Sequence, residues 1–102
     1  MSGFTNFSPK APESFTVKAN AQTLITRRTS EGVHTVLCIS NNSDVPVYLG
    51  FTAPKAEQGN AKVNHGITVF PKSVLMFDDP VPNGCAIWAT CASGEAIIGV
   101  QQ

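Results

Sequence analysis

The sequence contains little charge, and the charge it carries is balanced. Charged residues make up 14% of 102 residues, and seven Lys and Arg residues offset seven Asp and Glu residues. Typical soluble domains are roughly 25% charged. Arg27-Arg28 and Asp78-Asp79 are the only adjacent like charges. Since nucleic-acid-binding domains gather Lys and Arg into a basic patch, we expect no nucleic-acid partner. The polar surface is expected to consist mainly of Asn, Gln, Ser and Thr, which neighbouring proteins cover easily.

Long apolar segments are also missing. The longest runs, such as Val74 to Phe77, have only a few residues, whereas a membrane-spanning helix needs about 20. The N-terminal sequence MSGFTNFSPKAPES has no charged region followed by an apolar core, so it does not predict a secretory signal. We therefore expect synthesis in the cytoplasm and no membrane partner.

Cysteine is scarce, and the number of cysteines is odd. Small secreted scaffolds usually carry even sets that form disulfides. Of the three cysteines, Cys38 and Cys91 lie within apolar, strand-like runs, where a free thiol behaves as a small hydrophobic group. We expect Cys38, Cys85 and Cys91 to be reduced and mainly packed in the interior.

Motifs for metal binding and catalysis are missing as well. The sequence has no C-x-x-C pair, the kind of short spacing that zinc sites use. It also lacks a G-x-S-x-G nucleophile turn and a G-x-x-x-x-G-K phosphate loop. The sequence therefore predicts no metal, no cofactor and no catalytic residue, and we do not expect an enzyme.

What the sequence does contain is a series of short strand-like runs. From Ser14 onward, runs rich in Val, Ile, Thr and aromatic residues alternate with clusters of Gly, Asn, Asp and Pro. This pattern is typical of an antiparallel β-sandwich or barrel, and 102 residues suit one domain. Large aromatic residues such as Phe51, Phe70, Tyr48 and Trp88 are expected in the core. The eight predicted strands cover residues 14–19, 22–28, 33–40, 45–51, 66–70, 73–77, 85–91 and 95–100.

Two irregular segments stand out as candidate contact surfaces. Residues 1–13 contain Pro9 and Pro12 among small polar residues, which predicts an extended N-terminal arm before a single domain of residues 14–102. Residues 52–65 form the longest irregular stretch inside that domain, and such loops often carry recognition. Together with the turn at 79–84, these segments supply the predicted partner-binding residues: Phe4, Phe7, Ala56, Gln58, Asn60, Lys62, Asp79, Val81 and Asn83.

Three segments resemble small all-β virion proteins of tailed bacteriophages. They are SNNSDVPVYLG (40–50), GITVFPKSVLMFD (66–78) and AIWATCASGEAIIGV (86–100). The shared features are an Asn and Ser turn leading to an aromatic residue and Gly, a G-I-x-V strand before Pro, and an A-x-W-A strand before Ser-Gly. The resemblance implies a jelly-roll or related β-sandwich that oligomerises on a capsid, and it supplies no catalytic residue. It makes architectural positions of Tyr48, Gly50, Gly66, Trp88, Ser93 and Gly94.

The function that we expect from this resemblance is capsid decoration. Such a cement protein would bind the major capsid protein and stabilise the shell at the virion surface, after synthesis in the host cytoplasm. A symmetric homo-oligomer would gain affinity by docking several equivalent sites at once, and we favour a trimer over a dimer.

Two other functions remain open. In a carbohydrate-binding or tail- or fibre-associated module, exposed Trp88 and Tyr48 rings would stack on sugars. A small hydrolase would require His34 or His65 within hydrogen-bond reach of a serine or cysteine in a pocket. Exposure of the two rings discriminates between the decoration protein and the sugar-binding module.

Overall fold

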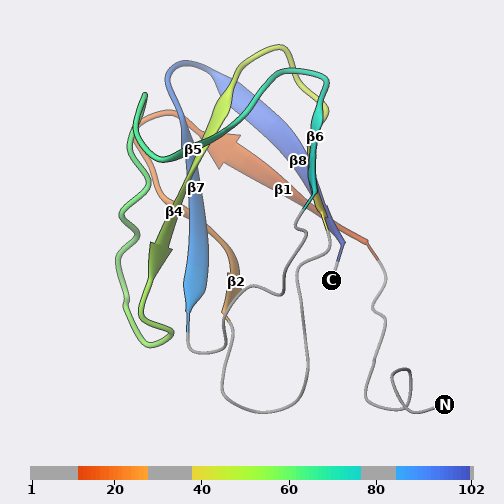
Figure 1. Ribbon diagram of the computed structural model, residues 1–102. Helices are drawn as coiled ribbons and strands as arrows, with labels where there is room; N and C mark the ends of the chain where they lie inside the picture. The colour runs from red at the N-terminus through yellow and green to blue at the C-terminus, as the bar shows by residue number, and fades with distance from the viewer. Residues whose placement is uncertain (1–11, 28–37, 77–84, 102) are drawn as a thin grey trace, which may run out of the picture.

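The computed structural model describes residues 12–27, 38–76 and 85–101, and these residues form two four-stranded antiparallel sheets (Figure 1). The first sheet has the order β1 (Glu13–Lys18), β8 (Glu95–Gln101), β3 (Cys38–Asn41) and β6 (Val74–Met76). The second has the order β2 (Thr23–Arg27), β7 (Ala86–Cys91), β4 (Val47–Thr52) and β5 (Ile67–Val69). The described residues contain no helix, and therefore none that could cross a membrane.

For the described residues, the prediction of an all-β fold with eight strands is confirmed. Each strand lies within the predicted range or extends it by a single residue at one end. Residues 28, 33–37 and 77, which were predicted to belong to the second, third and sixth strands, lie outside the described residues. So do Phe4 and Phe7 of the predicted arm and Asp79, Val81 and Asn83 of the predicted turn.

The strands pair as if the first half of the chain were folded back along the second. β1 pairs with β8, β2 with β7, β3 with β6, and β4 with β5, all antiparallel. Further pairings of β3 with β8 and of β4 with β7 join these ribbons into the two sheets. Consequently β1 and β6 are the edges of the first sheet, and β2 and β5 are the edges of the second.

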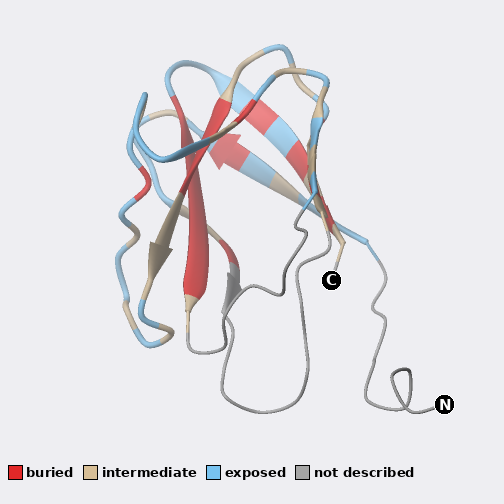
Figure 2. Ribbon diagram, in the orientation of Figure 1, coloured by how far each residue is buried: buried red, intermediate tan, exposed pale blue. Residues whose placement is uncertain are grey.

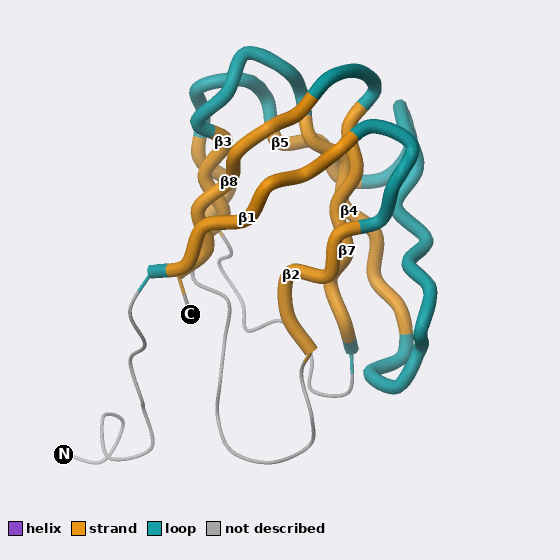
Figure 3. Tube along the Cα trace, turned by 180° about the vertical axis from the view of Figure 1, so that it is seen from behind, coloured by secondary structure: helices purple, strands orange, loops and turns teal. Residues whose placement is uncertain are grey.

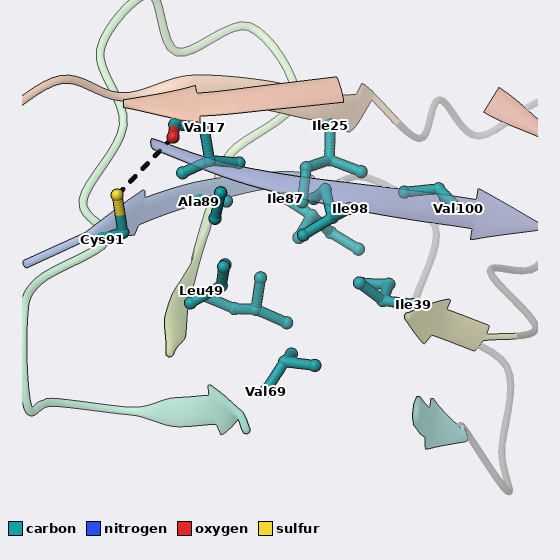
Figure 4. Close-up of a cluster of buried hydrophobic side chains, with 12 residues drawn as sticks. Val17, Ile25, Ile39, Leu49, Val69, Ile87, Ala89, Cys91, Ile98 and Val100 are labelled. Atoms are coloured by element: carbon teal, nitrogen blue, oxygen red, sulfur yellow. Dashed lines mark hydrogen bonds between the residues drawn. The ribbon is translucent and has the colours of Figure 1, made fainter. Parts of the chain in front are cut away.

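The two sheets share one hydrophobic core, which Figure 4 shows in close-up. Residues alternate along β8 between buried and more exposed positions, as Figure 2 shows, because successive side chains of a strand point to opposite faces of its sheet. Burying an aliphatic side chain of this size is worth about 1.5–3 kcal/mol, so the shared core is the main stabilising element. The first sheet contributes Val17, Ile39, Ala96, Ile98 and Val100, and the second contributes Ile25, Val47, Leu49, Val69, Ile87, Ala89 and Cys91.

One buried polar side chain connects the sheets at the end of β3. Asn41 is 1% exposed, and its Nδ2 donates to the carbonyl oxygens of Val45 (2.7 Å) and of Val69 in β5 (3.0 Å). Its Oδ1 accepts hydrogen bonds from the backbone N–H (3.0 Å) and the hydroxyl (2.6 Å) of Ser43. The amide therefore ties the first sheet to the second and shapes the turn into β4.

Replacing this amide tests how much the connection contributes. We expect Asn41→Ala to lower the free energy of unfolding by about 2–3 kcal/mol, because two buried carbonyls and a backbone N–H lose their partner. Asn42→Ala is the matched control, since Asn42 is exposed and its hydrogen bonds to Ile97 and Lys72 involve only its backbone. Urea unfolding followed by far-ultraviolet circular dichroism measures both. Equal stability of the two variants would contradict this role for Asn41.

Candidate functional site

The outer face of the second sheet is covered by the loop between β4 and β5, residues 53–66, called here the covering loop. Trp88 on β7 and Tyr48 on β4 point to this face and are only 6% and 7% exposed. The indole Nε1 of Trp88 donates to Thr52 Oγ1 (2.9 Å), and the Tyr48 hydroxyl donates to Asn64 Oδ1 (3.1 Å). Both rings are therefore buried with their polar atoms satisfied, as large amphipathic aromatic residues require.

Hydrogen bonds fasten the covering loop to the sheet. The Gln22 side chain donates to the Ala61 carbonyl (2.8 Å) and accepts from the Ala61 N–H (3.0 Å), so it binds the loop backbone twice. On the other side, Asn60 Nδ2 donates to the carbonyl of Phe51 (2.7 Å). The loop is thus attached both to the segment before β2 and to the end of β4.

Two glycines allow the covering loop to lie this close. A Cβ atom at Gly59 would lie 2.6 Å from Cδ2 of Trp88, and one at Gly50 would lie 2.6 Å from the backbone nitrogen of Ala61. Real Cβ atoms essentially never approach so closely. Any larger residue at either position would therefore push the loop away from the sheet.

The burial of Tyr48 and Trp88 under the covering loop corrects the place where both rings were expected. It also bears on the sugar-binding alternative, and the loop contains several of the predicted partner-binding residues. Tyr48 and Trp88 are buried as expected, but under the covering loop and not between the sheets. They therefore present no stacking platform for a sugar. Among the residues predicted to bind a partner, Gln58, Asn60 and Lys62 are exposed and Ala56 is half-buried, although Asn60 already serves the fold through its bond to Phe51.

A set of apolar side chains lies exposed on the first sheet and the segment that leads into it. Val74 and Met76 of β6 are 55% and 64% exposed, and Ile97 of β8 is 53% exposed. Phe70, between β5 and β6, is 64% exposed, which shows that its expected place in the core was wrong. We call Phe70, Val74, Met76 and Ile97 the apolar surface.

The surroundings of β6 leave its outer side chains uncovered. Register places Met76 opposite Cys38 and Val74 opposite Ser40 on the neighbouring strand β3, and Ser40 in turn lies opposite Gly99 of β8. These small residues do not project far enough to cover the larger side chains beside them. Sequence reasoning missed this surface, although the alternation of Val74, Leu75 and Met76 already placed two of the three residues on the face opposite to the core.

A groove opens beside the covering loop, at the edge of the second sheet. It has a volume of about 290 Å³ and is lined by Leu49, Gly50, Phe51, Asn60, Lys62, His65, Gly66 and Ile67. Its floor is largely apolar, and Lys62 and His65 are its basic residues. His65 Nδ1 lies 2.9 Å from the carbonyl oxygen of Val63.

Comparisons with protein-family models, with curated proteins and with solved structures find no match to this chain.

The His, Cys, Asp and Glu side chains of the described residues do not gather into a metal site. No group of three or more His, Cys, Asp or Glu residues there could hold a metal ion. Cys38, Cys85 and Cys91 are free thiols; Cys91 is buried, whereas Cys38 and Cys85 are only half-buried. Burial raises the pKa of the Cys91 thiol, and its Sγ lies 3.5 Å from the carbonyl oxygen of Val17 (Figure 4). This thiol is therefore protonated and sheltered at neutral pH. His34 lies outside the described residues.

The covering loop can be tested through Trp88, which is the only tryptophan of the chain. Gly59→Ala is expected to lift the loop, because the added methyl group has no room beside the indole. The tryptophan emission maximum should then shift to longer wavelength as water reaches the ring. Gln58→Ala, at the exposed neighbouring position, should leave the emission unchanged. An unshifted spectrum for Gly59→Ala would contradict the close contact between loop and ring.

The raised pKa of Cys91 predicts slow alkylation of the native protein. In iodoacetamide at pH 8, Cys91 should react at least about tenfold faster once denaturant is added, since unfolding both exposes the thiol and lowers its pKa. The pKa of the Cys91 thiol is higher in the folded than in the unfolded protein. The stability that this difference contributes is therefore fully present at a pH below the unfolded-state pKa, and it is lost as the pH rises through the folded-state pKa. Peptide mass spectrometry of timed samples measures the labelling. Equal rates in native and denaturing buffer would show that Cys91 is not sheltered.

Proposed function

We propose that this chain is a virion structural protein that decorates a capsid, binding the major capsid protein and stabilising the shell. The observation that carries the proposal is the apolar surface on and beside β6 and β8. The proposal assigns binding, not catalysis, to the protein, and it includes no metal or cofactor.

The exposure of this surface favours a protein partner. Contiguous exposed apolar side chains mark a site of interaction on a soluble protein, and Val74 and Met76 are exposed on the same face of β6. The edge strand β6 is short, as edge strands often are, but its three residues, Val74, Leu75 and Met76, are all apolar. The low charge of the chain adds to this argument, because few charged groups would need to be desolvated on docking. The choice of a capsid as partner rests on the resemblance of residues 40–101 to phage virion proteins.

The fold that we propose is a jelly-roll β-sandwich. The strand orders β1-β8-β3-β6 and β2-β7-β4-β5 support it, because an eight-stranded ribbon folded back on itself and rolled into two sheets pairs its strands in this way. Jelly rolls occur in viral capsid proteins and in lectin domains. Since a fold does not specify a function, the topology is compatible with decoration and with sugar binding.

The second candidate, a carbohydrate-binding or tail- or fibre-associated module, has less support. Trp88 and Tyr48, the rings that would stack on a sugar, lie beneath the covering loop. For the decoration protein, we expect a symmetric homo-oligomer, because it converts weak single contacts into high avidity on a repeating capsid lattice. We favour a trimer over a dimer.

Two positive charges introduced into the apolar surface should strongly weaken binding of the protein to capsid shells. Val74→Lys with Met76→Lys is expected to weaken binding to capsid shells by at least about a hundredfold, since burial of each apolar side chain is worth about 1.5–3 kcal/mol. The shells are those of the virus that encodes the chain, purified without it, and binding is measured by cosedimentation. Ala92→Lys with Ser93→Lys is the matched control, because it adds two charges in an exposed turn.

The control should bind like the original protein, and circular dichroism should show that both variants are folded. Unchanged cosedimentation of the Val74 and Met76 variant would contradict a role for the apolar surface. Failure of the original protein to bind any capsid shell would contradict the proposed function as a whole.

A further inference from the structure

The groove beside the covering loop exists because β5 is shorter than its neighbour. β4 pairs with β7 over six residues, from Val47 to Thr52, but it pairs with β5 over only three, from Val47 to Leu49. Beyond Leu49, no strand among the described residues therefore pairs with the outer edge of β4. The covering loop runs beside β4 (Figure 3). The groove lies between this loop, the end of β4 and β5.

The walls of the groove combine apolar side chains with positive charge. Phe51, which is half-buried, contributes apolar surface from β4, and Ile67, which is 38% exposed, contributes it from β5, whereas the Leu49 side chain points into the core. Lys62 and His65 stand on the covering loop, and no Asp or Glu lines the groove among the described residues. The one salt bridge found between described residues, from Lys72 to Asp44, involves neither of them.

The loop wall is held in place by bonds before and after Lys62. Asn60 donates to the Phe51 carbonyl, and Asn64 accepts from the Tyr48 hydroxyl. His65 follows Asn64 directly, and its N–H donates to the Lys62 carbonyl (3.1 Å) and closes a turn. Because the backbone that carries Lys62 and His65 is already fixed, little ordering cost falls on a ligand that binds there.

We propose that this groove binds an extended peptide segment of another protein, in which an apolar side chain is followed by an acidic residue. The apolar side chain would pack on Phe51 and Ile67, and the carboxylate would bind Lys62 with His65 beside it. The peptide would lie extended between β4 and the covering loop without adding a strand to the sheet, because the Phe51 carbonyl at this edge already accepts from Asn60. A volume of about 290 Å³ is at the lower limit of ligand pockets and suits one or two side chains.

This site is separate from the proposed capsid contact. None of the groove residues belongs to the apolar surface. The peptide site can therefore be tested on the isolated chain without any capsid, and its failure would leave the proposed decoration function untouched.

The test is a titration followed by two-dimensional ¹H–¹⁵N nuclear magnetic resonance. The probe is the blocked peptide acetyl-Gly-Phe-Asp-Gly-amide, and its comparison is the neutral peptide acetyl-Gly-Phe-Asn-Gly-amide. We expect the acidic peptide to shift the amide signals of Gly50, Lys62, His65 and Gly66, and to bind at least about fivefold more tightly than the neutral one.

Two substitutions test separately whether the charge of Lys62 and the apolar surface of Ile67 contribute to peptide binding. Lys62→Ala should remove the preference for the acidic peptide, whereas Lys55→Ala, an exposed lysine of the same loop that does not line the groove, should retain it. Ile67→Ser should weaken both peptides about equally, because it removes apolar surface and no charge. Unaltered ¹H–¹⁵N spectra elsewhere will show that each variant is folded.

Four results would overturn the proposal. The first three are the absence of shifts at the groove with either peptide, equal affinity for the acidic and neutral peptides, and an acidic preference that survives in Lys62→Ala. Tighter binding of free acetyl-phenylalanine than of the blocked acidic peptide would also overturn it, because the site would then recognise a terminal carboxylate and not an extended segment.

Discussion

The central strand β7 has to be covered on both of its faces, and much of the structure follows from that requirement. All six of its residues are buried. Ile87, Ala89 and Cys91 face the core between the sheets, and Ala86 and Trp88 face outward beneath the covering loop. A two-sheet protein covers only the inner face of each sheet. The outer face of this strand therefore needs the loop, the Gln22 amide that fastens it, and the glycines that let it approach.

The covering loop in turn creates the groove. It crosses the end of β4 because it has to reach Trp88 before the chain returns as β5, and β5 is too short to fill the edge that remains. The same loop carries Lys62 and His65 to that edge. The loop that buries Trp88 thus also places two basic residues beside the groove.

The first sheet has the opposite character on its outer side. There the strands present Ser40, Gly99, Val74 and Met76, and no loop among the described residues buries the larger two. The two sheets are held together by their common core and by the Asn41 amide at the end of β3. Among the described residues, the outer face of the second sheet is therefore covered by the chain, whereas Val74 and Met76 on the first sheet are exposed, and the proposed decoration function depends on this asymmetry.

The sequence by itself determined the strands, because period-two alternation and turn residues are local signals that survive without tertiary context. The run from Val45 to Phe51 and the run from Cys85 to Cys91 indicated β4 and β7 almost to the residue. Local signals also excluded a long membrane helix and the common catalytic motifs. They did not identify which of two apolar faces meets the core, since an alternating strand looks the same at the centre of a sheet and at its edge.

Only the tertiary structure decided which apolar residues are covered. Phe70 was expected inside and is exposed, because it falls in the crossing from an edge strand of one sheet to an edge strand of the other. Trp88 is buried by a loop more than twenty positions earlier in the chain, through Gly59, a contact that no local pattern encodes. The position of Lys62 and His65 beside Leu49 and Ile67 likewise depends on how β4 and β5 pair. Burial depends on contacts between residues far apart in the sequence. Such contacts also place the covering loop along the groove, where it forms one wall.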